Sequence, residues 1–174
     1  MSWCCIAPAR LAGQSEEMVQ ASGRLGEAMG VAFQMIDDII DYSQSGEKPF
    51  AQDLREGLVN FVTLEMLENN PSLKYPIQRL LSIPDGSSDG SGDESGESSK
   101  DLKPSGVPKS SATGWPWQSY ELAAACDRVR ARSQAKLELA DQTLSQMANS
   151  FSNPDPEAMQ ALRSILLYLR ERVR

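Results

Sequence analysis

The stretch GVAFQMIDDIIDY, Gly30 to Tyr42, places three acidic side chains within about one turn of a segment that is otherwise apolar. Residues three and four positions apart share a face of a helix, so Asp41 lies over both Asp37 and Asp38. Carboxylates this close repel one another and call for a counter-charge. Mg²⁺ prefers hard oxygen ligands and is usually held by one or two carboxylates together with substrate phosphates. The pattern therefore points to diphosphate chemistry.

The alternative interpretation is that the three acids form the solvated face of a surface helix, which is how most acidic runs are built. The neighbouring side chains favour burial instead, because apolar bulk surrounds the acids on both sides: Phe33, Ile36, Ile39 and Ile40. We therefore expect part of this turn to be buried or to line a cavity. A bound metal ion would account for acids in such a place.

The same stretch resembles the second aspartate-rich motif of the trans-isoprenyl diphosphate synthases, whose pattern is G-x-x-F-Q-x-x-D-D-x-x-D. The matching positions are Gly30, Phe33, Gln34, Asp37, Asp38 and Asp41. Downstream, GEKPFAQDLREG (46–57) is similar to the family's segment G-K-x-x-x-x-D-L-R-x-G, and Lys48 stands where the family has a lysine that contacts the allylic diphosphate. The closing sequence YLRERVR, from Tyr168, is similar to the last helix of the family.

The resemblance implies a Mg²⁺-dependent prenyltransferase, in which an allylic diphosphate ionises and the alkene of isopentenyl diphosphate attacks the carbocation. It implies that Asp37, Asp38 and Asp41 bind the metal, and that Asp37 and Lys48 are catalytic. Lys48 would also bind substrate, as would the two residues that precede the acids: Phe33, which would line the hydrocarbon tunnel, and Gln34, which would orient the motif or the substrate.

Two departures from the family pattern qualify this expectation. The family's first aspartate-rich motif and its basic residues for isopentenyl diphosphate would lie before Ser2, so we expect a C-terminal half that is inactive alone. A homodimer of the full-length form, or a partner chain, would then supply the first motif. At the second departure, Leu58 follows Gly57 where many relatives carry a lysine, which removes one phosphate contact.

Two rival functions stay open at this point. The first is a noncatalytic helical partner subunit or pseudoenzyme of a prenyl diphosphate synthase that retains the motif. The second is an acidic helical interaction domain with a flexible arm. The missing half favours the first rival. The intact acidic motif and Lys48 argue against it, because a purely structural helix has no use for three clustered acids.

Composition excludes several classes of function. The 174 residues carry 17 lysines and arginines against 24 acids, a net charge of −7, which argues against nucleic-acid binding. The chain contains no histidine, so Ser-His and Cys-His nucleophilic mechanisms are excluded, and three cysteines make a poor disulfide framework. No apolar run approaches the roughly 20 residues of a membrane span, and we expect a cytoplasmic protein.

Helical periodicity dominates the chain, and no useful length alternates with period two, so we predict an all-α bundle of the isoprenoid synthase type, present in part. A short apolar segment, 3–11, is interrupted by Pro8, and close packing explains Gly23 and Gly26. Further helices are expected at 15–42, 53–69, 73–83, 120–149 and from 155 to the last residues. Residues 1–83 would carry the motif, 84–118 would be a disordered Ser/Gly/acidic insertion, and 119–174 would complete the bundle.

Overall fold

The computed structural model describes residues 1–43, 49–81, 114–151 and 154–172, and within these ranges the chain forms helices and no strand. The predicted all-α class is thus confirmed. The helices are α1 (Ser2–Leu11), α2 (Glu16–Asp41), α3 (Gln52–Arg55), α4 (Phe61–Asn69), a 3₁₀ turn (Pro71–Leu73), α5 (Lys74–Leu81), α6 (Ser119–Ser150) and α7 (Pro156–Arg172). In the described part of the chain, none of these helices combines the length and the apolarity that crossing a membrane requires.

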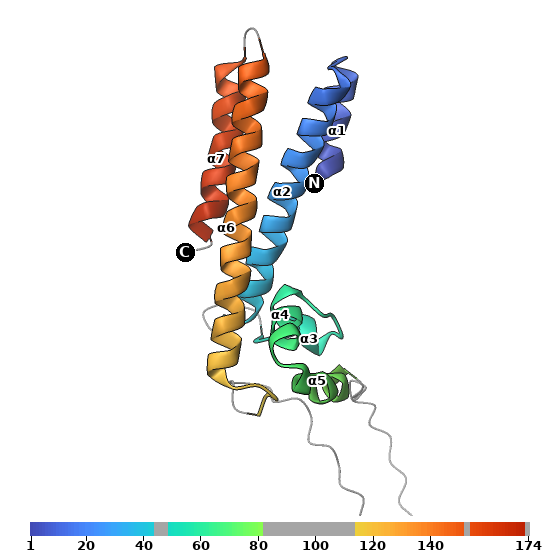
Figure 1. The fold of residues 1–174 in the computed structure, drawn as a ribbon, viewed down its shortest axis with the longest axis vertical. Coiled ribbons are helices and arrows are strands. Elements are labelled where there is room, and N and C mark those ends of the chain that lie inside the picture. Colours follow the sequence, from blue (N-terminus) through green and yellow to red (C-terminus); the bar gives the residue numbers. More distant parts are fainter. Residues whose placement is uncertain (44–48, 82–113, 152–153, 173–174) are drawn as a thin grey trace, which may run out of the picture.

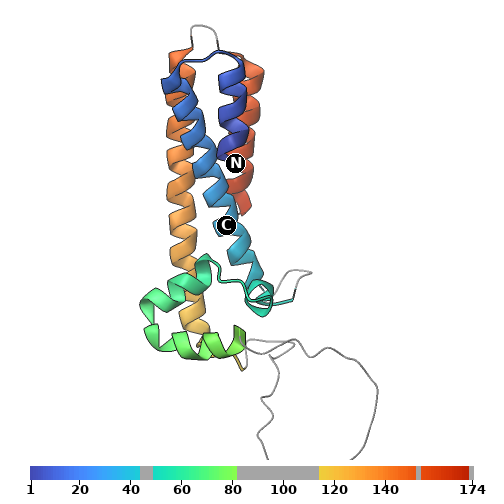
Figure 2. The ribbon, with the colours of Figure 1, turned by 90° about the vertical axis from the view of Figure 1, so that its right-hand side faces the viewer.

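Two long helices, α2 and α6, pack along each other, and α1, α4 and α7 pack against them (Figure 1). The first helix, α1, lies on α2, and α7 lies on α6. The short helices α3, α4 and α5 gather at the other end, where α2 ends and α6 begins (Figure 2). This end of the rod therefore surrounds the aspartates at the end of α2.

The boundaries of α2 follow its capping residues and confirm the predicted helix at 15–42. The hydroxyl of Ser15 accepts a hydrogen bond from the amide of Met18, and Tyr42 is the C-cap. The close packing predicted at the glycines is also found: a Cβ atom on Gly26 would lie 2.8 Å from both the Sγ of Cys5 and the carbonyl oxygen of Met1. Contrary to expectation, Pro8 does not interrupt α1.

The single helix predicted at 53–69 is wrong, because the chain breaks between Arg55 and Phe61. Gly57 adopts a φ of +84°, a left-handed conformation that suits glycine and ends α3. Asn60 then starts α4 as an N-cap whose side-chain oxygen accepts from the amide of Thr63 at 3.0 Å. The predicted helix at 73–83 is found as α5, whereas residues 82 and 83 lie outside the described ranges.

The C-terminal helices occur where the sequence predicted them. Asp155 caps α7 by accepting a hydrogen bond from the amide of Glu157 at 2.9 Å, just before Pro156. On α7, Leu166 and Leu169 are buried, whereas Ile165 is 46% exposed. Residues 84–113 of the predicted insertion lie outside the described residues.

Two apolar clusters form the core. The larger joins α2, α4, α5 and the start of α6, and it includes the stacked indoles of Trp115 and Trp117, whose ring centroids lie 4.9 Å apart. Both indoles are buried, so the predicted disordered insertion at 84–118 is wrong at its end, where Trp115 and Trp117 pack into the core. The second cluster joins α2, α6 and α7. Since α2 contributes to both, its position is fixed from two sides.

Candidate functional site

The three aspartates predicted as metal ligands diverge at the end of α2. Asp38 and Asp41 are buried, with 2% and 7% of their surface exposed, whereas the side chain of Asp37 is 43% exposed. Their carboxylates face three different parts of the molecule. One helical turn thus offers the same functional group in three environments.

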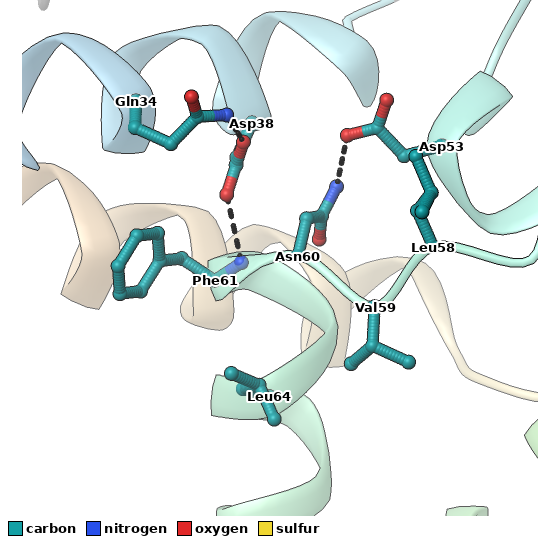
Figure 3. A pocket seen from close by; sticks show the side chains of 8 residues that line it. All are labelled: Gln34, Asp38, Asp53, Leu58, Val59, Asn60, Phe61 and Leu64. Carbon is teal, nitrogen blue, oxygen red and sulfur yellow. Dashed lines mark hydrogen bonds between the residues drawn. The ribbon is translucent and has the colours of Figure 1, made fainter.

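Asp38 points toward the beginning of α4 (Figure 3). Its Oδ2 accepts a hydrogen bond from the amide of Phe61, the first residue of that helix, at 2.8 Å. Its Oδ1 accepts from Nε2 of Gln34, also at 2.8 Å. A carboxylate is favoured there because the first amides of a helix have no partner within the helix. Burial nevertheless raises the pKa of Asp38, and these two hydrogen bonds oppose the shift only in part.

Asp41 holds the beginning of α3. Its two carboxylate oxygens accept hydrogen bonds from the amides of Gln52 at 3.0 Å and Asp53 at 3.3 Å. Its backbone oxygen accepts from the amide of Ala51 at 2.9 Å, a residue with a left-handed φ of +53°. Burial, together with the nearby charge of Asp53, raises the pKa of Asp41 to about 6. The segment after the motif is therefore anchored directly on the motif.

Asp37 forms an ion pair with the end of α7. Its Oδ1 lies 3.6 Å from an Nη2 of Arg172, and the guanidinium of that arginine stands 5.7 Å from the ring centre of Phe33. Within the described part of the chain, Asp37 has no backbone amide as a hydrogen-bond donor. Its carboxylate is therefore the most accessible of the three to a ligand.

A hollow of about 390 Å³ lies between α2 and the loop that leads into α4 (Figure 3). One wall is polar. Within this wall, Nδ2 of Asn60 donates a hydrogen bond to Oδ2 of Asp53 at 3.0 Å. The other wall is apolar and open, with Leu58 57% exposed. The lining residues are Gln34, Asp38, Asp53, Leu58, Val59, Asn60, Phe61 and Leu64.

The structure brings together only some of the residues predicted for the site. Gln34 and Asp38 share the hollow, and Asp53, which was not predicted as a site residue, joins them. The sequence feature that could have indicated Asp53 is its position as the first residue of the D-L-R-x-G segment. Phe33 lies outside the hollow and is half-buried against α6 and α7, so its tunnel role stays a prediction. Lys48 lies outside the described residues.

Of the three aspartates, Asp37 alone presents an exposed carboxylate to which a magnesium ion can bind. Over the ranges that the structure describes, three or more acidic, histidine or cysteine side chains do not gather into a group that could hold a metal. A closed protein cage is not what Mg²⁺ requires, however, since one or two carboxylates, waters and ligand phosphates commonly suffice. The exposed carboxylate of Asp37 can serve as such a ligand, whereas both carboxylate oxygens of Asp38 accept hydrogen bonds within the protein.

Comparison with known proteins assigns the family. A family model described as polyprenyl synthetase matches residues 1–91, about half of the chain, and this region contains the three aspartates. The chain belongs to the polyprenyl synthetase family.

Curated members of the polyprenyl synthetase family align with the same region. This chain is 37% identical over 92 residues to a probable mitochondrial hexaprenyl pyrophosphate synthase of Yarrowia lipolytica, covering 51% of this chain and 20% of that protein. It is 33% identical over 81 residues to a decaprenyl-diphosphate synthase of Dictyostelium discoideum, covering 45% of this chain and 18% of that protein. The matched region thus spans about a fifth of each relative.

Solved polyprenyl synthetase structures match almost the whole chain in fold. A decaprenyl diphosphate synthase from Rhodobacter capsulatus superposes with a TM-score of 0.60 and 20% identity, covering 99% of this chain and 45% of that one. A geranylgeranyl pyrophosphate synthase from Corynebacterium glutamicum, complexed with calcium and isoprenyl diphosphate, gives a TM-score of 0.57, also at 20% identity, covering 97% of this chain and 44% of that one. The helices therefore have the isoprenoid synthase fold over slightly less than half the length of those enzymes.

Proposed function

We propose that this chain supplies the second aspartate-rich half-site of a prenyl diphosphate synthase. The observation that carries the proposal is the arrangement at the end of α2: Asp41 and Asp38 are buried and hold the beginnings of α3 and α4, Asp37 is accessible, and a hollow opens beside Asp38. Family membership supports it, since the matched region contains this turn. A structural neighbour with the same fold was crystallised with calcium and isoprenyl diphosphate.

The proposed reaction joins isopentenyl diphosphate to an allylic diphosphate. The carbon–oxygen bond of the allylic substrate breaks, diphosphate leaves with the bonding electrons, and the alkene carbon of isopentenyl diphosphate forms the new carbon–carbon bond before losing a proton. When bound, Mg²⁺ supplies Lewis-acid stabilisation of the departing diphosphate. The proposed reaction requires two features of this chain: an accessible carboxylate and a rigid support for that carboxylate.

Each aspartate takes a separate part in this proposal. Asp37 offers the accessible oxygen toward the metal–diphosphate unit. Asp38 and Asp41 have a structural role, since their hydrogen bonds hold the beginnings of α4 and α3 in place around the hollow. Gln34 orients Asp38 through its hydrogen bond. Lys48, in the segment between Asp41 and α3, is proposed to neutralise charge on the leaving diphosphate.

A second candidate function is a noncatalytic subunit or pseudoenzyme that assembles with a synthase. One observation favours it: Leu58, at the position where many relatives carry a lysine, lies 57% exposed at the rim of the hollow. An apolar side chain there offers nothing to a phosphate. It suits contact with another protein instead.

An assay of prenyl transfer separates the two functions. In the complete synthase, with the first aspartate-rich motif present in the same chain or in an added partner, we expect incorporation of labelled isopentenyl diphosphate. Asp37→Ala should lower turnover by orders of magnitude, while Asp141→Ala, on α6 and paired with Arg170, should leave it near normal. Near-normal activity of Asp37→Ala would remove this carboxylate from the site and favour the noncatalytic subunit.

Two further proposals concern the setting of the protein. A cytoplasmic location follows only from the sequence, and the curated relatives include mitochondrial and chloroplastic proteins. Cell fractionation with an antibody to the chain tests it. A homodimer of the full-length form is proposed from the family resemblance, and sedimentation of that form would test the proposal.

A further inference from the structure

Among the described residues, Arg172 forms an ion pair with Asp37, the accessible acid of the motif, although the two residues are far apart in the sequence. Arg172, in the last turn of α7, places Nη2 3.6 Å from Oδ1 of Asp37, 135 positions away in the sequence. Its guanidinium also stands 5.7 Å from the ring centre of Phe33 and 5.9 Å from that of Tyr168. Cation–π contacts with these two rings thus help to hold the guanidinium beside the motif.

The two arginines in the last turn of α7 pair with different helices. Arg170, two residues earlier, lies 3.4 Å from the carboxylate of Asp141 on α6 and is therefore directed to another helix. Arg172 instead reaches α2, where Asp38 and Asp41 already receive backbone amides and Asp37 does not. The arginine thus neutralises the member of the acidic turn that is accessible to a ligand.

On the basis of the proposed function, we propose that Arg172 is a positioning residue that occupies Asp37 in place of a divalent cation and competes with that cation for the carboxylate. The pair is partly exposed, with 31% of the arginine side chain and 43% of the aspartate side chain accessible. Exposed ion pairs are weak, so a divalent cation can displace the guanidinium at modest cost. Binding of the ion would then release the last turn of α7 from α2.

The competition predicts that loss of the guanidinium raises the affinity for the ion. Exposed pairs of this kind shift an equilibrium by about two- to fivefold. We therefore expect Arg172→Gln to bind a divalent cation about two- to fivefold more tightly than the wild-type chain. Arg172→Lys keeps the positive charge and should bind nearly as the wild type does.

The experiment measures Mn²⁺ binding to the 174-residue chain, with the electron paramagnetic resonance signal of free Mn²⁺ as the readout and Mg²⁺ as competitor. Arg170→Gln is the matched control, because it removes one ion pair between α7 and a neighbouring helix without touching Asp37. Asp37→Asn reports whether the binding site includes that carboxylate. Thermal melts by circular dichroism check that all variants are folded.

A tighter Kd for Arg172→Gln, with Arg170→Gln unchanged and Arg172→Lys near the wild type, supports the inference. An unchanged or weaker Kd for Arg172→Gln overturns it, as does an equal shift in Arg170→Gln or an absence of Mn²⁺ binding in every variant. If Asp37→Asn loses binding but Arg172→Gln changes nothing, the inference alone fails. If Asp37→Asn binds as tightly as the wild type, the metal role of Asp37 in the proposed function fails as well.

Discussion

Three aspartates within five residues have different surroundings and, in our account, different tasks. Asp38 and Asp41 accept hydrogen bonds from the first amides of two other helices, and Asp37 meets a guanidinium and solvent. The sequence treats the three as equivalent, because spacing alone places them all on adjoining faces of one turn. Only the tertiary structure shows which of them is accessible.

This division predicts opposite effects of two neighbouring substitutions on stability. Asp38→Ala leaves the amide of Phe61 without its acceptor and should lower the free energy of unfolding by about 1–3 kcal/mol. Asp37→Ala removes a partly exposed ion pair and should cost less than about 1 kcal/mol. Urea unfolding followed by circular dichroism measures both. Equal losses in the free energy of unfolding would show that Asp38 is no more important to the folded structure than Asp37.

A second prediction concerns pH. The pKa of Asp41 is raised to about 6 in the folded chain, so the folded state holds a proton that the unfolded state releases near its ordinary pKa of 3.8. The contribution of Asp41 to the free energy of unfolding is therefore fully present below pH 3.8. It is lost as the pH rises through about 6, because the buried side chain must then ionise. Between pH 5 and pH 7 the loss should be about 1 kcal/mol.

Asp41→Asn removes this titration while keeping an oxygen acceptor of the same size. Urea unfolding at the two pH values should therefore show a smaller loss of stability in the variant than in the wild-type chain. The same pH dependence in both proteins would mean that another group is responsible.

At the scale of helices, the sequence predicted the long elements well and the short ones poorly. Regular apolar spacing and strong caps, Ser15 for α2 and Asp155 for α7, gave boundaries within one or two residues. Between α3 and α4 the apolar spacing continues across a break, so periodicity alone predicted one helix. Gly57, with its left-handed backbone, and the cap Asn60 were the local signals for two.

The contact between α1 and α2 provides a prediction at this scale. A Cβ atom at Gly26 would lie 2.8 Å from the carbonyl oxygen of Met1 and 3.0 Å from the Cα of Ser2, so the backbones must separate. Gly26→Ala should therefore lower the free energy of unfolding by about 1–3 kcal/mol. A thermal melt measures the loss.

Gly30→Ala is the matched control on the same helix. Its two nearest contacts are side-chain atoms of Met1, at 3.1 Å and 3.5 Å, and a flexible side chain can move by the few tenths of an ångström that are needed. Alanine also gains up to about 1 kcal/mol of helix propensity over glycine, so this variant should be neutral or slightly stabilised. A loss as large as that of Gly26→Ala would show that close packing is not specific to Gly26.

Across the whole molecule, α4 and α6 are joined near the site by a buried acid that no local pattern indicated. Glu65 accepts from Nε of Arg128 at 2.6 Å and from Nη1 of Arg132 at 3.0 Å. Burial alone would raise the pKa of Glu65, but these hydrogen bonds outweigh it and lower the pKa. The link fixes α4, and with it one wall of the hollow, against the central helix α6.

The fold class and the motif could be predicted because helical spacing and the acidic cluster are local properties of the sequence. Three features of the site could not, since each depends on residues distant along the chain: the pairing of Asp37 with Arg172, the anchoring of α4 on Asp38, and the place of Phe33 beside α7. Sequence spacing states which residues share a turn. It does not state which other helix that turn will meet.

Calorimetric titration of the 174-residue chain with an uncleavable allylic thiolodiphosphate, with and without Mg²⁺, tests whether the end of α2 is a metal–diphosphate half-site. We predict binding that requires Mg²⁺ and that is lost in Asp37→Asn, while Asp141→Asn, on α6 and away from the motif, binds as the wild type does. Binding without Mg²⁺, binding unaffected by Asp37→Asn, or no binding to the folded wild-type chain would contradict the claim that this turn is a metal–diphosphate half-site.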